Sequence, residues 1–240
     1  MSNLSLMSAS ETASNVAAAV VADPVINESL WETTARFMQE GGTFMYIILG
    51  IFLFGLAIAV ERFIYLSTTK LNNRRIWKKL QPHLDSGDMT SVQTIIDKSS
   101  TGVAKILSYG LVQSQAGRRS DDIEMAMEEG LMEVLPRLEK RTQYLATFAN
   151  IATLLGLLGT IMGLISAFTA VANVDPAEKA NLLSASISVA MNTTAFGLMA
   201  AIPLLLSFSY LQSKTTEIVD SLEMATVKFV NQLRKGLRNA

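Results

Sequence analysis

Three uncharged polar side chains lie inside an apolar segment that is long enough to cross a membrane. Asn192, Thr193 and Thr194 occur in the stretch SVAMNTTAFG, residues 188–197, which contains no charged residue. One amide and two hydroxyls can exchange hydrogen bonds with water, and their oxygens can coordinate a small cation. The alternative is that the hydroxyls bond back to the preceding helical turn and only help helices to pack, which is common in membrane helices.

A second apolar segment carries a matching set of small and hydroxylic residues. At about 100° per residue they share an arc of roughly 80° on one side of a helix, and they are Thr153, Gly156, Thr160, Gly163 and Ala167. The third segment has a comparable arc, formed by Ala190, Thr193, Thr194, Gly197 and Ala201. Two such faces on consecutive antiparallel helices predict close contact with each other or with a further helix.

These residues form the candidate site, and we assign them two roles. The expected ion-pathway residues are Thr160, Thr194, Thr193 and Asn192. The expected helix-packing residues are Gly156, Gly163, Gly197 and Pro203, the last of which removes one backbone hydrogen bond. No catalytic residue, metal site or cofactor is expected, because the chain has no cysteine and a single histidine, His83.

The distribution of charge identifies the elements that must position the site. Between Thr142 and Ser213 the only charged residues are Asp175, Glu178 and Lys179, although 17% of the whole chain is charged. A soluble domain would not go so long without charge. Three segments reach the roughly 20 apolar residues that a membrane-spanning helix needs. The sequence therefore predicts an all-α integral membrane protein with three transmembrane helices, two of them extended into a cytoplasmic helical bundle.

Lysine and arginine set the expected orientation. Twelve of the 20 lie in residues 67–141 and five after residue 212, against one before the first span and one in the hairpin loop. The positive-inside rule then places the N-terminus outside, on the side that is the periplasm if the membrane is a bacterial inner membrane, and the C-terminus in the cytoplasm. The predicted parts are a flexible periplasmic tail (1–23), an interfacial amphipathic helix (24–42), transmembrane helix 1 (43–66), a cytoplasmic helical region (67–141), transmembrane helix 2 (142–172), a periplasmic loop (173–180), transmembrane helix 3 (181–212) and a cytoplasmic helical tail (213–240).

The cytoplasmic region is expected to consist of short helices followed by one long helix. Residues 72–120 predict short amphipathic helices, with breaks at 85–88, 99–102 and 117–120. After residue 120 no strong breaker occurs before the Asp175-Pro176 turn, so a continuous helix of about 50 residues is predicted, which Pro136 could bend. Glu61 and Arg62, at the inner end of the first span, are expected to anchor that span or to pair with the bundle.

Two runs of sequence carry a family resemblance. LLGLLGTIMGLISAF (154–168) and SISVAMNTTAFGLMAAIP (186–203) closely resemble the two membrane motifs of the ExbB/TolQ/MotA proton-channel family, and three spans match its ExbB/TolQ branch. The resemblance implies a homo-oligomer, a pentamer in the family, whose second and third spans line a pore. It further implies an ExbD/TolR-like dimer of single-span subunits carrying a membrane aspartate, which Thr160 and Thr194 would face, and a load such as a TonB-like protein.

One departure from the family pattern concerns the ion. Many ExbB and TolQ sequences have a glutamate five residues before the third-span threonine, where this chain has Val189. Without an acid in the pore-facing part of either span, a proton-driven cycle requires a titratable group from a partner. The family favours H⁺, but threonine oxygens also suit Na⁺, so both ions remain open.

The implied function is that of a stator for an ion-driven motor, which is not an enzyme. The rival interpretation is a structural membrane scaffold that holds a partner without conducting ions. A solute transporter is weakly supported, because the chain has no inverted repeat and no charged midplane site. Basic residues alternate with acids in the cytoplasmic parts, so no nucleic-acid partner is predicted, and the surroundings are the lipid bilayer.

Overall fold

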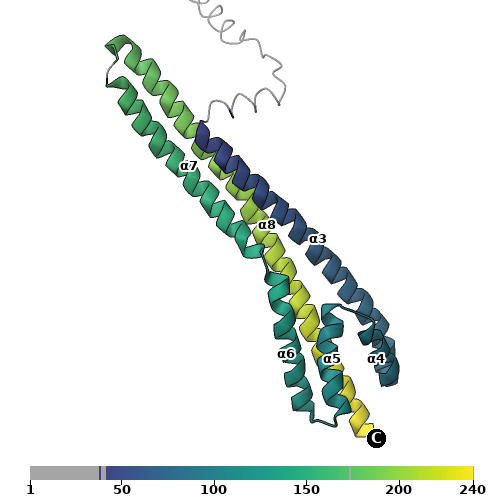
Figure 1. The fold of residues 1–240 in the computed structure, drawn as a ribbon. Helices are drawn as coiled ribbons and strands as arrows, with labels where there is room; N and C mark the ends of the chain where they lie inside the picture. The colour runs from purple at the N-terminus through teal and green to yellow at the C-terminus, as the bar shows by residue number, and fades with distance from the viewer. Residues whose placement is uncertain (1–37, 39–41, 173, 240) are drawn as a thin grey trace, which may run out of the picture. The chain divides into compact units, whose positions relative to one another are not determined.

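The computed structural model describes residues 38, 42–172 and 174–239. Contacts divide the chain into two units, Met1–Gly41 and Gly42–Ala240, and the second contains every helix discussed below. The predicted tail (1–23) lies outside the described residues. Apart from Met38 and Gly42, so does the predicted interfacial helix (24–42). The elements of the second unit are the helices α3 (Thr43–Ser86), α4 (Met89–Asp97), α5 (Gly102–Gln115), α6 (Ser120–Glu139), α7 (Thr142–Val171) and α8 (Pro176–Asn239), and the described residues include no strand (Figure 1).

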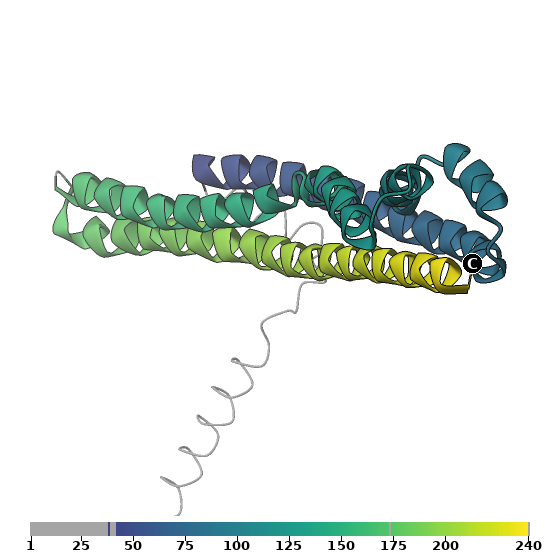
Figure 2. The ribbon, with the colours of Figure 1, turned by 90° about the horizontal axis from the view of Figure 1, so that it is seen from below.

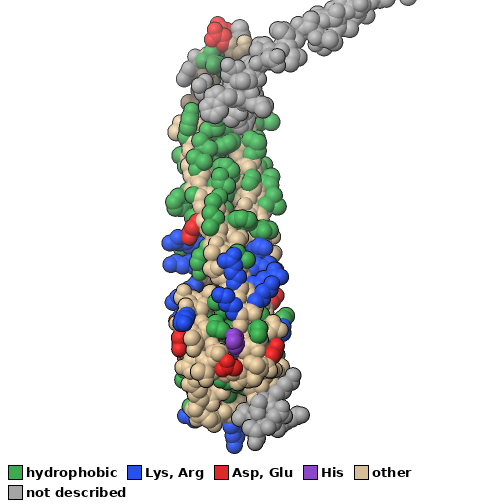
Figure 3. Space-filling model, turned by 90° about the vertical axis from the view of Figure 1, so that its right-hand side faces the viewer, with side chains coloured by type: hydrophobic (Ala, Val, Ile, Leu, Met, Phe, Trp, Pro, Cys, Tyr) green, Lys and Arg blue, Asp and Glu red, His purple; other side chains and the backbone are tan. Residues whose placement is uncertain are grey.

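Three of the described segments are long and apolar enough to cross a membrane, as the sequence predicted. They lie within Thr43–Ser86, Ser120–Val171 and Glu178–Arg234. α7 and α8 form an antiparallel hairpin, and α3 runs along it in both ribbon views (Figures 1 and 2). Hydrophobic side chains cover one part of the surface in Figure 3, and Lys and Arg gather directly below that part. The protein is therefore an all-helical membrane protein.

The second half of α8 forms the centre of the helical bundle. Its buried side chains follow a helical period and include Ile218, Leu222 and Phe229, none of which is exposed to solvent. They pack with residues of α5 and α6, among them Leu107 and Met127, in one continuous core. An amphipathic helix is stable only when its apolar face packs against other helices. The packing on α5 and α6 therefore stabilises the amphipathic second half of α8, which follows its apolar first half.

The short helices of the bundle begin and end where the sequence predicted breaks. Gly87 adopts φ 74°, a left-handed conformation that ends α3. The Asp88 side chain then caps α4 by accepting a hydrogen bond from the Ser91 amide at 3.1 Å. Thr101 caps α5 in the same way through the Ala104 amide. A third turn, around Gly117 with φ 67°, connects α5 to α6.

The first helix is longer than predicted. The residues from 72 to the break at 85–88 were expected to form a short helix apart from the first span, but α3 continues without interruption from the apolar segment to Ser86. Pro82 lies inside it, four residues before its end. No glycine or proline separates the apolar part from the basic part, and Leu66 and Leu80 are both fully buried against the other helices. Continuous packing therefore keeps the two parts in one helix.

The predicted helix of about 50 residues is wrong, because it is broken at Lys140 and Arg141. Arg141 has φ 66°, the one positive φ among the described non-glycine residues, and α7 starts at Thr142. Side chains of α3 hold the break: Arg62 donates a hydrogen bond to the Leu138 carbonyl, and Glu61 pairs with Arg141 at 3.1 Å. The last carbonyls of a helix lack partners within it, so the Arg62 contact stabilises the end of α6.

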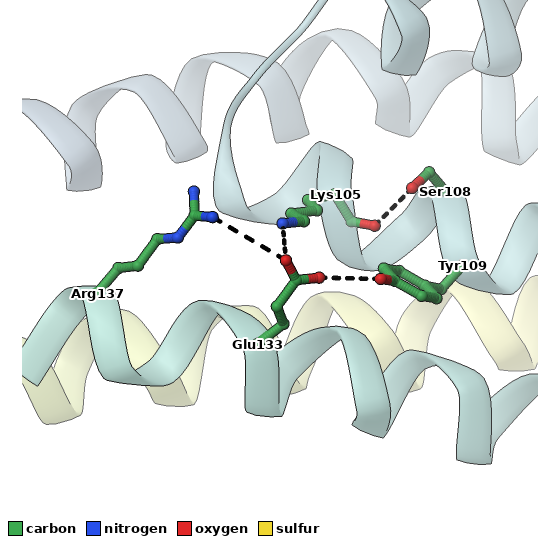
Figure 4. Close-up of polar contacts among 5 residues, drawn as sticks. All are labelled: Lys105, Ser108, Tyr109, Glu133 and Arg137. Carbon is green, nitrogen blue, oxygen red and sulfur yellow. Dashed lines mark hydrogen bonds and ion pairs between the residues drawn. The ribbon is translucent and has the colours of Figure 1, made fainter.

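Glu133 connects α5 to α6 at the surface of the bundle. Its carboxylate accepts hydrogen bonds from the Lys105 ammonium and, at 2.9 Å, from the Tyr109 hydroxyl, and Arg137 approaches it to 4.0 Å (Figure 4). The hydrogen bond from Lys105, followed by that from Tyr109, holds the pKa of Glu133 below its usual value of 4.5. The carboxylate form is therefore the form that joins the two helices.

The Glu133 contacts predict how the bundle responds to acid. A carboxyl whose pKa is lowered on folding stabilises the fold above its unfolded pKa, and this contribution is lost as the pH falls through the lowered folded pKa. We expect Glu133→Gln to lower the melting temperature at neutral pH and to flatten its decline on acidification. Thermal unfolding of the detergent-solubilised chain across the acid range measures this. Glu128→Gln, an exposed change on the same helix, should keep the wild-type slope, and equal slopes for all three proteins would contradict the prediction.

Candidate ion-pathway site

α7 and α8 approach each other most closely at two glycines. A Cβ atom added to Gly197 would lie 2.8 Å from the Ala152 carbonyl oxygen and 2.9 Å from the Gly156 Cα. A Cβ atom added to Gly156 would lie 3.2 Å from the Gly197 Cα and 3.3 Å from the Thr194 Cα. Only hydrogen fits between the two backbones here, so the small faces of the two helices contact each other.

Three oxygen atoms gather beside this contact. The Thr194 hydroxyl donates to the Gly156 carbonyl across the helix pair at 2.8 Å, and the Thr160 hydroxyl lies 3.2 Å from the same carbonyl in its own helix. The two hydroxyls are also hydrogen-bonded to each other. Both threonines are partly buried. The structure thus brings Thr160 and Thr194, which are 34 positions apart, into one cluster with the Gly156 carbonyl.

The neighbouring polar residues lie outside this three-oxygen cluster. Thr193 is 2% exposed, its hydroxyl donates to the Val189 carbonyl one turn earlier at 2.9 Å, and its side chain lies against Gly159. Asn192 is half-buried. The structure therefore places Thr193 in the α7–α8 contact, where its hydroxyl is bonded back along its own helix.

The remaining predicted packing residues, Gly163 and Pro203, lie in different surroundings. A Cβ atom on Gly163 would come within 2.7 Å of the Ala190 Cβ, so Gly163 also lies in the α7–α8 contact. Pro203 is exposed, and α8 continues through it without interruption. Its neighbour Leu204 is buried and fills the space that a side chain on Gly55 of α3 would need.

The oxygen cluster can pass on hydrogen bonds but cannot hold a proton. Three contacts join its three oxygens, and the two hydroxyls supply two hydrogens, so one contact is always without a hydrogen. The lone pairs of these oxygens that accept no hydrogen within the cluster can accept one from a water molecule or coordinate a small cation. The two apolar segments contain no Asp or Glu near these oxygens. Among the described residues, no group of three His, Cys, Asp or Glu side chains could hold a metal ion.

Two features of this region were not predicted from the sequence. Gly159 was left out of the small-residue face, although its spacing of three from Gly156 and four from Gly163 places it there. The break held by Glu61 and Arg62 gave no local signal, because its contacts join positions about 80 residues apart. A charged pair directly after an apolar run was the only available indication.

Comparison with known proteins places the site within a matched region. A model described as the MotA/TolQ/ExbB proton channel family matches residues 98–224, which include both apolar segments of the hairpin. The matched part contains Gly156, Thr160, Thr194 and Gly197. The resemblance read from the two sequence motifs is therefore supported by a match over more than half of the chain.

Individual relatives agree with this match. An ExbB homolog of Methanothermobacter thermautotrophicus is 29% identical over 204 residues, which cover 84% of this chain and 70% of that protein. The ExbB-like protein 3 of Synechocystis is 27% identical over 169 residues, covering 70% of this chain and 80% of that protein. The Tol-Pal system protein TolQ of Haemophilus influenzae is 32% identical over 93 residues, which cover 39% of this chain and 40% of that protein.

Proposed function

Because the chain belongs to the MotA/TolQ/ExbB proton channel family, we propose that it is the pore-forming stator subunit of an ion-driven motor in a bacterial inner membrane. The family consists of transport and energy-transduction proteins, and this chain is a membrane protein with three apolar helices. The proposed orientation, with the N-terminus in the periplasm and the C-terminus in the cytoplasm, rests on the distribution of lysine and arginine.

The cluster of Gly156, Thr160 and Thr194 is the observation that carries the proposal. It joins two membrane helices through polar atoms whose hydrogens do not satisfy every contact. Threonine hydroxyls are common in contacts between membrane helices, but here two of them share one carbonyl oxygen across the helix pair. An ion that passes this cluster would find oxygens that can exchange a hydrogen bond or act as ligands.

The cycle requires a carboxylate from another subunit. We propose a dimer of an ExbD/TolR-like single-span partner whose membrane aspartate faces Thr160 and Thr194 within a homopentamer of this chain. The aspartate would hold the transported H⁺, while the threonine hydroxyls orient it and the pentamer converts its titration into movement. The load would be an envelope process such as TonB-dependent uptake, through a TonB-like protein.

Reconstitution tests this function directly. The chain is purified with the product of a neighbouring gene that encodes a single-span protein with an Asp in its span, and both are placed in vesicles under an inside-negative potential. We expect acidification of the lumen, reported by an enclosed pH-sensitive dye, with the complex only. The partner Asp→Asn variant should reduce uptake to the level of the chain alone. A purely structural scaffold would give no uptake in any sample.

The same vesicles distinguish H⁺ from Na⁺. Threonine oxygens and the absence of a glutamate at Val189 also fit a sodium path, so the sodium-driven stator is the second candidate. Replacement of Na⁺ by choline at constant pH should leave proton uptake unchanged. Na⁺ uptake into the vesicles, reported by an enclosed sodium-sensitive dye and without acidification of the lumen, would favour Na⁺ as the coupling ion.

A further inference from the structure

A polar cavity lies between α3, the start of α5 and α6. Its volume is about 230 Å³, several times the roughly 30 Å³ that one water molecule occupies in the liquid. It is lined by hydroxyls and amides of Thr69, Asn72, Asn73, Ser100 and Thr101, and by two cations, Lys105 and Arg137. No carboxylate lines it, so its charge is positive.

Asn73 is the unusual residue of this cavity. Its side chain is 3% exposed, and neither the amide nitrogen nor the amide oxygen has a hydrogen-bond partner among the described residues. A Cβ atom placed on Gly102 would lie 3.7 Å from this nitrogen and 3.8 Å from this oxygen, so the amide faces the first residue of α5. An unsatisfied buried amide costs about 1–3 kcal/mol. A ligand that both accepts and donates a hydrogen bond would remove this cost.

The charges around the cavity favour an anion. α5 has 14 residues and starts at Gly102, so the positive end of its dipole lies at the cavity. Lys105 and Arg137 both approach Glu133, which lies outside the lining and can balance one of the two positive charges (Figure 4). Tyr65 also lines the cavity, and the Arg62 guanidinium lies 4.8 Å from the centre of the Tyr65 ring. A positive charge is therefore left for a ligand.

We propose that this cavity binds an anionic phosphate ester that also carries a hydroxyl group. A phosphate oxygen accepts from the Asn73 nitrogen and from Lys105 and Arg137, and the hydroxyl donates to the Asn73 oxygen. Tyr65 adjoins residue 66, the predicted inner end of the first span, so the headgroup of an inner-leaflet phospholipid such as phosphatidylglycerol can reach the cavity. A small soluble phosphate has the same chemistry. The site does not depend on the proposed ion conduction.

The test measures ligand binding to the full chain in dodecyl maltoside, which contains no phosphate. Native mass spectrometry compares retention of added phosphatidylglycerol with that of phosphatidylcholine, and equilibrium dialysis measures inorganic phosphate. We expect phosphatidylglycerol to be preferred. The loss of a charge-assisted hydrogen bond should weaken its binding about tenfold in Arg137→Gln and in Asn73→Leu. Arg137 is exposed, so Arg137→Gln should fold normally.

Arg75→Gln is the matched control, because it removes an exposed arginine of α3 that does not line the cavity. It should change binding by less than about twofold, as expected for a screened surface charge. If inorganic phosphate binds with the same variant pattern, the site is supported and its ligand is soluble. Equal weakening by Arg75→Gln and Arg137→Gln would show diffuse attraction to basic residues and overturn the proposal. Unchanged binding in Arg137→Gln and Asn73→Leu would overturn it as well.

Discussion

Gly197→Ala is expected to separate α7 from α8 and to destabilise the hairpin by about 1–3 kcal/mol, the usual cost of overpacking a tight contact. The added Cβ would lie under 3.0 Å from the Ala152 carbonyl oxygen and from the Gly156 Cα. Both are backbone atoms, which cannot turn aside as the end of a side chain can. The helices must therefore move apart, and the hydrogen bond from Thr194 to the Gly156 carbonyl lengthens.

Unfolding of the purified chain in mixed micelles with increasing sodium dodecyl sulfate measures this effect. Gly50→Ala is the control, because Gly50 is exposed in α3 and a Cβ atom added there would meet nothing within 4 Å. Alanine is the better helix former by roughly 1 kcal/mol, so Gly50→Ala should be neutral or slightly stabilising. Similar midpoints for the two variants would show that the α7 and α8 backbones are not in contact at Gly197.

Thr194→Val is expected to reduce ion transport by about tenfold while costing only about 1 kcal/mol of stability, the net value of one hydrogen bond. Valine keeps the shape of threonine but removes the hydroxyl that reaches the Gly156 carbonyl and Thr160. The helices can still pack, whereas the oxygen cluster loses one of its three members. Thr194→Ser retains the hydroxyl and should retain most of the transport.

The dye assay with the reconstituted complex measures transport, and size-exclusion chromatography measures assembly. Thr153→Val is the matched control on α7, because the Thr153 hydroxyl bonds to the Ala149 carbonyl of its own helix and is outside the cluster. It should transport like the wild type. Full transport in Thr194→Val would remove Thr194 from the ion pathway and would favour a packing role for its hydroxyl.

The α7–α8 contact could be predicted because its information is local. Residues such as Gly156, Gly163 and Gly197 recur at helical spacing, and two antiparallel helices joined by a short turn must face each other. The hydrogen bond between Thr160 and Thr194 was not predicted, because the two faces were equally consistent with contact to a further helix. Helix periodicity therefore predicted which residues of the two helices form the contact at the candidate site.

The helical bundle outside the apolar segments was less predictable, because contacts between distant residues decide its structure. Nothing in the sequence around Lys140 and Arg141 resembles a helix terminator, and the break depends on side chains of α3. The length of α3 was underestimated for a related reason: a basic sequence after an apolar one suggested a boundary, whereas packing keeps one helix. The cavity beside Asn73 likewise lies between three helices, and no local sequence pattern connects their lining residues.

The break between α6 and α7 determines which contacts set the angle between these two helices. A continuous helix resists bending through the backbone hydrogen bonds along its length, whereas across a break the angle depends on side-chain contacts and on packing against other helices. Here two neighbouring residues of α3 supply such contacts, Glu61 to Arg141 and Arg62 to the Leu138 carbonyl. The angle between α6 and α7 is therefore set by the inner end of the first apolar segment together with the packing of α6 on α5 and α8.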